Sequence, residues 1–449
     1  MQCPPTSPSP TETGNEPSWT SDPEIEARET WNVFLLATHQ VVLRIGWLFK
    51  TESVIMPAFL DYVAGPGAGW LRGCLPVLNR LGQSVPPIFC ARLLQAMRRK
   101  KRALAAFTIL MSLPFGALSI VWLRLGGQPR SWLAAVFLAL YFAFFVANGL
   151  YHLSFGTVQG KLVRPTRRGN LILLSTFWGT LPALLIAWWL LDDWLARPDY
   201  GFGYLFAFTA VAFLVSGLTA LLLREPRDRN AIGFESRGNV RETLHVLGRD
   251  GNLRLVVLVG ILFGSALMIS PHYQALARER LGLTGPHWMV WVIVQSAAVG
   301  IYSLFVGPLA DVRGNRLTLR LLIFGSAIAP AFAVALVRLP KDLGESLFWM
   351  VYIPLGITPL VYRILLNYAL EICEPDEHPR YLSIVSLGVA LPFVVSPLVG
   401  RLVDLAGFER VFAATILLLL ASGALTFRLS EPRHRVRGDE ARAVVGDSE

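Results

Sequence analysis

Twelve apolar stretches, each long enough to cross a lipid bilayer, constrain the fold of this chain more than any other feature. A helix needs about 20 apolar residues to span the hydrocarbon core, whereas strands of a membrane barrel alternate over runs of about ten. Backbone polar groups in hydrocarbon must be satisfied within their own segment, so each stretch is predicted to be a helix. The sequence therefore predicts an all-α integral membrane protein with twelve transmembrane helices, at 32–62, 67–94, 103–125, 131–158, 170–192, 203–223, 253–276, 286–309, 317–338, 345–369, 381–403 and 409–429.

Three landmarks at the ends of these spans occur twice. Residues 221–229 (LLLREPRDR) return as 427–435 (FRLSEPRHR), an offset of 206. Prolines in two polar connectors are 210 apart, and the basic turn 91–102 lies opposite 307–318 at an offset of 216. A near-constant offset is typical of a duplicated unit, so we predict two six-helix pseudo-repeats. The expected units are a disordered cytoplasmic tail (1–30), an N-terminal bundle (31–223), a cytoplasmic linker (224–252), a C-terminal bundle (253–430) and a cytoplasmic tail (431–449).

The positive charge of the chain lies in the connections between spans. The formal net charge is +10, but it is divided among short loops, which is the pattern of topology signals and not of a nucleic-acid-binding face. Connectors after spans two, four, six and eight hold six, four, seven and three basic residues, whereas the opposite connectors hold none to two. Both termini are therefore expected in the cytoplasm, with the protein in the inner or plasma membrane. Eight tryptophans at the predicted outer ends fit an interfacial belt: Trp70, Trp122, Trp132, Trp188, Trp189, Trp194, Trp288 and Trp349.

The cysteines and the N-terminal segment carry little functional information. Cys74 and Cys90 fall in one apolar span, and Cys3 and Cys373 in predicted cytoplasmic segments, so neither a disulfide nor a metal site is expected. The first thirty residues are polar and lack the apolar core of a signal peptide, so no cleaved leader is expected.

One connector carries a recognisable motif. Residues 307–316 read GPLADVRGNR, which resembles the G-x-L-a-D-R-x-G-R-[RK] signature of the major facilitator superfamily. Gly307, Asp311, Gly314 and Arg316 match, as do Leu309 and Ala310, whereas Val312 and Asn315 depart from it. The counterpart at 91–102 keeps only its basic run, while the segments 167–170 and 400–404 also look like that superfamily. The resemblance covers about 32–430 and implies a secondary transporter that works by alternating access, with spans one, four, seven and ten lining the path.

Ionisable and polar residues inside the spans are the candidate site. A charged group at mid-helix costs about 2.5–3.5 kcal/mol on insertion scales, so each such group is a functional candidate. The predicted proton-coupling groups are Glu52 and His272. The predicted substrate-binding residues are Arg44, Lys50, Arg80, Asn148, His152, Arg363 and Asn367.

Structural roles compete with these functional roles. Arg72 is expected to extend to the outer headgroups, and His152 and His272 could simply be hydrogen-bonded bundle residues. In a continuous helix Lys50 shares a face with His39, whereas Arg44 and Glu52 point elsewhere. Lys50 and Glu52 are then not expected to pair directly, since residues two apart do not face each other.

The excess of basic groups over Glu52 favours an anionic or polyhydroxylated small solute, because arginine forks suit carboxylates and phosphates. A proton gradient is the expected driving force, with no cofactor, no nucleic-acid partner and a monomeric carrier. The exchanger-type run of span five is missing from residues 175–190, which favours import or symport. A drug or metabolite exporter and a non-transporting sensor on a transporter scaffold stay as alternatives. An ATP-driven pump and a membrane enzyme are disfavoured, because residues 156–162 lack the full phosphate-loop pattern and no hydrolytic residue set is present.

Overall fold

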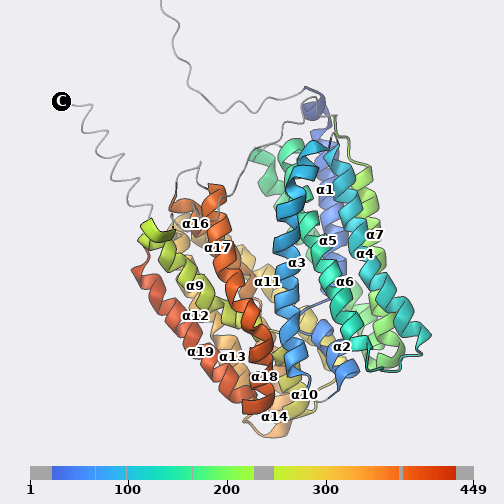
Figure 1. Ribbon diagram of the computed structural model, residues 1–449, viewed down its shortest axis with the longest axis vertical. Coiled ribbons are helices and arrows are strands. Elements are labelled where there is room, and N and C mark those ends of the chain that lie inside the picture. Colours follow the sequence, from blue (N-terminus) through green and yellow to red (C-terminus); the bar gives the residue numbers. More distant parts are fainter. Residues whose placement is uncertain are drawn as a thin grey trace, which may run out of the picture.

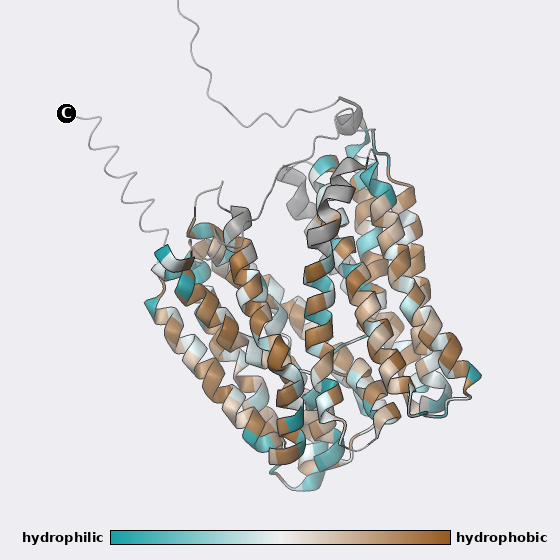
Figure 2. Cartoon of the chain, in the orientation of Figure 1, coloured by the Kyte–Doolittle hydropathy of each residue, from teal (hydrophilic) through white to brown (hydrophobic). Residues whose placement is uncertain are grey.

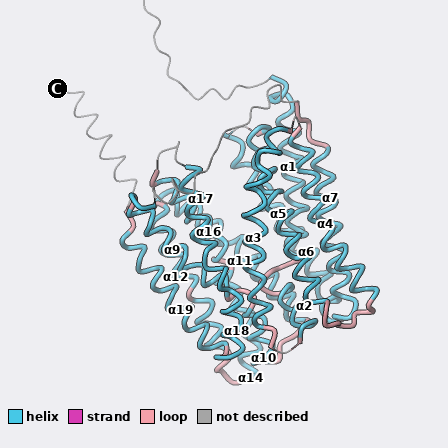
Figure 3. The backbone as a smooth tube through the Cα atoms, in the orientation of Figure 1, coloured by secondary structure: helices cyan, strands magenta, loops and turns pink. Residues whose placement is uncertain are grey.

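The computed structural model is a bundle of membrane-length helices, and it describes residues 23–65, 67–97, 99–163, 165–226, 247–373 and 378–430. Helical segments occupy all twelve predicted positions, and no strand occurs among these described residues (Figure 3). Most of the predicted linker, the predicted C-terminal tail and residues 1–22 lie outside them. Residues 23–30, predicted to belong to a disordered tail, instead form the start of α1. The first half contains α1 (Pro23–Phe49), α2 (Ile55–Ala64), α3 (Gly69–Ala96), α4 (Lys100–Arg124), α5 (Leu133–Leu162), α6 (Pro165–Ala196) and α7 (Pro198–Leu221).

The second half has shorter segments. These are α9 (Gly251–Met268), α10 (His272–Leu281), α11 (Pro286–Arg313), α12 (Asn315–Ser326), α13 (Ile328–Leu336), α14 (Lys341–Leu347), η1 (Phe348–Val351), α15 (Tyr352–Leu355), α16 (Thr358–Glu371), α17 (His378–Ala390), η3 (Leu391–Val395), α18 (Ser396–Ala406), α19 (Phe408–Leu425) and η4 (Thr426–Arg428). Figure 1 shows the two halves as two bundles side by side, with the start of α1 and the end of α19 at the same end of the molecule.

The helices have the length and surface of a membrane protein. Ten helical segments within the described ranges are long and apolar enough to cross a bilayer. Their outward faces carry large apolar side chains, and hydrophilic residues gather towards the two ends (Figure 2). The tryptophan belt was predicted only in part correctly, because Trp122 and Trp288 are buried core residues. Trp70, Trp132, Trp188, Trp189 and Trp349 are exposed, as the belt requires.

Several predicted spans are interrupted rather than continuous. The first span breaks between Phe49 and Ile55, and the seventh breaks between Met268 and His272. These breaks occupy corresponding positions in the two halves, which is where discontinuous helices form binding sites in carriers. Span ten is divided into α14, η1, α15 and α16, and span eleven into α17, η3 and α18. Prolines inside these spans remove backbone donors and favour such interruptions, as at Pro354, Pro359 and Pro392.

Close backbone contact joins the two halves where α3 crosses α18. A methyl group added at Gly400 would lie 2.7 Å from the carbonyl carbon of Gly69. One added at Gly73 would lie 2.8 Å from the Cα of Pro397. These glycines therefore permit a helix crossing that any side chain would block.

The repeated Glu-Pro landmark has a structural role in the first half. The Glu225 carboxylate accepts hydrogen bonds from the backbone N–H groups of Lys100 (3.0 Å) and Lys101 (2.8 Å) at the start of α4. It also pairs with Lys161 Nζ at 2.8 Å. A carboxylate at this position satisfies donors that the first turn of α4 leaves open and complements the helix dipole. Glu225 thereby ties the exit of α7 to α4 and α5.

Glu225→Ala is expected to lower the thermal midpoint of the detergent-purified protein. The lost cap costs about 1 kcal/mol, and the buried Lys161 contact adds about 1.5–3 kcal/mol. The midpoint should fall by several degrees, whereas Glu345→Ala, at an exposed i,i+4 pair with Lys341, should leave it nearly unchanged. Equal thermal midpoints for the two variants would contradict the role of Glu225 in joining α7 to α4 and α5.

Candidate functional site

The main cavity lies between the two halves and has a volume of about 700 Å³. The first half contributes residues of α1, α5 and α6, and the second half residues of α11 and α16. One part of its wall is apolar and aromatic, with Trp47 and Phe155, and the rest is rich in amides and hydroxyls. The lining residues that can hydrogen-bond a solute are Gln40, Arg44, Thr51, Glu52, Tyr151, His152, Gln159, Thr180, Gln295, Ser296 and Arg363.

Two arginines from opposite halves set the charge of this cavity. Arg44 lies on α1 and Arg363 on α16, and their positive charges act on each other. In the part of the chain that the structure describes, neither guanidinium has an ion pair or a hydrogen-bond acceptor. Two uncompensated cations in one membrane cavity are unfavourable until an anion enters.

Glu52 stands where the main cavity meets a smaller one and lines both. Its Oε1 pairs with Lys50 Nζ at 2.7 Å, and its Oε2 accepts hydrogen bonds from Asn79 and from Tyr141 Oη (3.2 Å). The prediction that Lys50 and Glu52 do not pair is therefore wrong. Because α1 ends at Phe49, the backbone turns at Lys50 and the helical spacing rule no longer applies.

Lys50 is a partner of Glu52 and does not line either cavity. Its side chain is 0% exposed, and its Nζ lies 3.7 Å from the ring centre of Trp47 and 4.4 and 4.3 Å from those of Phe144 and Phe145. An aromatic cage of this kind stabilises an ammonium by cation–π attraction. The ion pair and the cage together hold one positive and one negative charge at the break of the first span.

The smaller cavity has a volume of about 280 Å³ and lies on the other side of Glu52. Asn79, Arg80 and Gln83 of α3 line it, and Gln83 Nε2 donates to Asn79 Oδ1 at 2.5 Å. The Arg80 guanidinium carbon is 5.0 Å from the ring centre of Tyr362 and 5.3 Å from that of Phe393, both in the second half. This cavity, like the main one, is thus bounded by both halves.

The structure separates the predicted substrate-binding residues into three groups. Arg44, His152 and Arg363 line the main cavity, and Arg80 lines the smaller one. Lys50 is buried against Glu52. Asn148 and Asn367 line neither cavity, and the fully buried amide of Asn148 has no hydrogen-bond partner within the described chain. Tyr352, on the separate segment α15 of span ten, stacks on Trp291 with the ring centres 5.1 Å apart.

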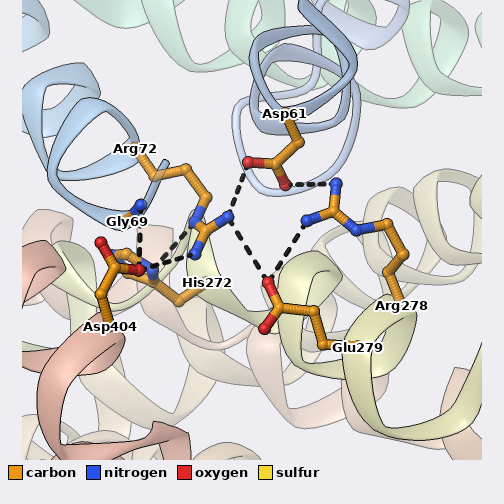
Figure 4. Close-up of polar contacts among 7 residues, drawn as sticks. All are labelled: Asp61, Gly69, Arg72, His272, Arg278, Glu279 and Asp404. Carbon is orange, nitrogen blue, oxygen red and sulfur yellow. Dashed lines mark hydrogen bonds and ion pairs between the residues drawn. The ribbon is translucent and has the colours of Figure 1, made fainter. Parts of the chain in front are cut away.

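A charge network joins the two halves at the end of the molecule that lies opposite the start of α1 and the end of α19 (Figure 4). We call this the closed end; it consists of Asp61, Gly69, Arg72, His272, Arg278, Glu279 and Asp404. Asp61 of α2 pairs with Arg72 of α3 at 2.6 Å and with Arg278 of α10 at 3.0 Å. Arg72 also faces Glu279 (3.9 Å) and Asp404 (3.7 Å). The network therefore joins residues of the two halves.

Two predicted roles change at the closed end. Arg72 was expected to extend to the headgroups, but it is only 1% exposed and paired inside the protein. His272 is fully buried and is not among the residues that line either cavity, and its Nδ1 lies 3.3 Å from Arg72 Nε. Asp61 was not among the predicted site residues, although an acidic residue within an apolar span is itself a signal of a site.

The predicted conformational motif forms the turn between α11 and α12. Gly314 has a φ of +88°, a conformation that favours glycine. Gly307, by contrast, has open space around its Cα, so close helix packing does not explain it. Arg316 Nη1 donates to the Leu429 carbonyl at 3.0 Å. The side chain of Asp311 lies outside the described residues.

Other polar groups of the site were not predicted. Gln295 and Ser296 of α11 line the main cavity, and Ser53 Oγ donates to Gln295 Oε1 at 2.5 Å across the two halves. Their signal was an adjacent polar pair inside an otherwise apolar span. No group of three or more potential metal ligands occurs among the described residues.

These features define a class: a multi-pass membrane protein of two helical bundles with a cavity between them that is lined by both apolar and polar side chains. A family model described as Major Facilitator Superfamily matches residues 291–446. No curated protein sequence gives a significant match. Solved structures show the same fold over most of the chain.

Three of those structures are transporters. A nucleoside transporter, NupG, has a TM-score of 0.66 at 10% identity, covering 90% of this chain and 100% of that one. A D-xylose-proton symporter has a TM-score of 0.63 at 14% identity, covering 89% and 98%. The E. coli fucose:proton symporter FucP has a TM-score of 0.57 at 13% identity, covering 90% and 99%. The predicted resemblance is confirmed: residues 291–446 match the superfamily model in sequence, and about nine-tenths of the chain shares its fold with transporters of known structure.

Proposed function

We propose that the protein is a secondary transporter that carries a small organic anion across the membrane by alternating access, driven by a proton gradient. The membrane fold and the superfamily match support transport in general. The cavity between the halves is the proposed path, and the halves 31–223 and 253–430 are the proposed moving units.

The observation that supports an anionic solute is that two arginines, Arg44 and Arg363, line the main cavity together. The two come from opposite halves and have no compensating carboxylate in the described chain. Glu52, the acidic group in this lining, already pairs with Lys50. An anion held between the two guanidinium groups would remove their mutual repulsion and allow the halves to approach.

The closed end suggests which side the cavity faces. Ion pairs seal one end, whereas the main cavity extends to Gln159, near the last turn of α5 at the other end. With both termini in the cytoplasm of a plasma-membrane carrier, as the loop charges predict, this arrangement faces inward. We take the monomer as the working unit, because one chain encloses both cavities.

Glu52 is the proposed proton-coupling group. It lies at the junction of the two cavities, and its charge decides whether Lys50 has a carboxylate partner. Protonation would leave a buried ammonium unpaired, and an incoming anion would compensate that charge. Proton binding at Glu52 would then raise the affinity for the anion, and anion binding would raise the affinity of Glu52 for the proton by the same factor.

The test begins with a thermal-shift screen of organic carboxylates, phosphate esters, neutral sugars and organic cations on the purified protein, since ligands of the folded state raise the midpoint. The best anion is then radiolabelled and its uptake measured in proteoliposomes. Arg44→Gln and Arg363→Gln should each lower apparent affinity about tenfold to a hundredfold, because a charged hydrogen bond is lost. Arg124→Gln, which removes an exposed charge at the end of α4, is the matched control.

Stabilisation by sugars or cations alone, with both cavity variants behaving as wild type, would contradict the anionic class. Proton coupling is checked separately by imposing a pH gradient. Glu52→Gln should lose gradient-driven accumulation while anion exchange without a gradient continues.

A further inference from the structure

The smaller cavity contains a third arginine with no carboxylate partner. Arg80 lies on α3 of the first half, between the rings of Tyr362 and Phe393 of the second half. Stacking occupies the faces of a guanidinium and leaves the N–H donors at its edge free for an acceptor. Within the described chain Arg80 has neither an ion pair nor a hydrogen bond. The cavity beside it therefore offers an unused anion-binding fork.

The two cavities are neighbours. Glu52 lines both, and in α16 the adjacent residues Tyr362 and Arg363 line the smaller and the main cavity respectively. A solute long enough to extend past Glu52 can therefore place one end in each cavity. Amide and hydroxyl groups of Asn79 and Tyr141 lie on this route, so its wall is polar.

Glu52 does not neutralise Arg80. One carboxylate oxygen accepts from Lys50, and the other accepts from Asn79 and Tyr141. With that ion pair counted as neutral, three guanidinium groups remain: Arg44, Arg80 and Arg363. One monoanion between Arg44 and Arg363 would leave Arg80 without any negative partner, whereas a solute with two anionic ends would place one negative charge in each cavity.

We infer that the transported solute carries two separated anionic groups, one held between Arg44 and Arg363 and the other by Arg80. This inference rests on the proposed anion transport and narrows it to dianions with a spacer between the charged ends, such as α,ω-dicarboxylates. The aromatic rings around Arg80 orient its fork towards the second group, so Arg80 determines selectivity between dianions and monoanions. It is not needed for binding the first group.

The test compares dicarboxylates from succinate to suberate with the corresponding mono-amides, which have the same length and one charge fewer. Binding to the purified full chain is measured by calorimetry at neutral pH, where the carboxylates are ionised. For one chain length, the dicarboxylate should bind at least about tenfold more tightly than its mono-amide, which is the usual effect of one charged hydrogen bond. We call this quotient of the two affinities the ratio. Arg80→Gln should abolish that ratio while mono-amide affinity stays within about threefold of wild type, because the two sites are separate.

Two further variants secure the result. Ser270→Asp adds a negative charge to the smaller cavity and should also abolish the ratio, so the test does not depend on one variant folding. Arg124→Gln, outside both cavities, should keep it. Equal binding of dicarboxylates and mono-amides by the wild type, or an unchanged ratio in Arg80→Gln and Ser270→Asp, would overturn the inference and leave anion transport intact. Failure of every anion to bind would overturn both proposals.

Discussion

Asp61→Asn is expected to open the closed end and to favour the opposite-facing arrangement by on the order of a hundredfold or more. Asp61 is buried and shared by two arginines, Arg72 of the first half and Arg278 of the second. Removing one partner of a buried ion pair costs about 3–5 kcal/mol, because the other charge is left without compensation. The part of that loss that comes from the Asp61–Arg278 pair falls on the closed arrangement, because only this pair requires the two halves to meet.

The shift is measurable by cysteine labelling. In a variant without native cysteines, Ser270→Cys places a thiol in the smaller cavity. A membrane-impermeant maleimide added from the side of the closed end should label it slowly in the parent and much faster with Asp61→Asn. Asp342→Asn, an exposed residue of α14 at the same end, is the matched control.

Arg278→Gln removes the Asp61–Arg278 pair between the halves, leaves the Asp61–Arg72 pair in place, and serves as a second variant should Asp61→Asn fold poorly. Labelling at the parental rate in both variants would show that the network does not hold this end closed. An increase with Asp342→Asn as well would point to general loosening of the protein.

Lys50→Met and Glu52→Gln are expected to destabilise the protein singly and much less in combination. Lys50 is completely buried, and its one carboxylate partner in the described chain is Glu52. Glu52→Gln leaves the ammonium with only its aromatic cage, which offsets about 2 kcal/mol of a cost of about 3–5 kcal/mol. The double variant removes both charges, so a double-mutant cycle should give a coupling free energy of about 1–3 kcal/mol.

Thermal and denaturant unfolding of the four proteins in detergent measures this cycle. Glu52 is 30% exposed in its side chain, so solvent screens part of its interaction and sets the lower end of the range. Lys341→Met with Glu345→Gln, an exposed pair, supplies the control cycle and should show almost no coupling. Strict additivity of Lys50→Met and Glu52→Gln would mean that the pair does not act as a unit.

The positions of the spans could be read from the sequence because each depends on local composition alone. A run of about 20 apolar residues forms a helix in a bilayer wherever it occurs. The candidate site was harder, because cavity residues come from five helices. Arg44, Glu52, His152 and Arg363 were found because a charge or imidazole in hydrocarbon is itself a signal. Asn148 and Asn367 line neither cavity. A neutral amide costs less in hydrocarbon than a charge does, so its presence in a span is weaker evidence for a site.

The sequence by itself determined an α-helical membrane chain of two similar halves, since hydropathy and internal repetition are properties of the one-dimensional chain. Only the tertiary structure decided that the first span breaks at Lys50, that Lys50 therefore pairs with Glu52, and that Arg72 is buried in the network that closes one end. The physical reason is that helical periodicity relates residues within one helix. Contacts across a break or between bundles depend on how separate helices pack, which no spacing along the chain records.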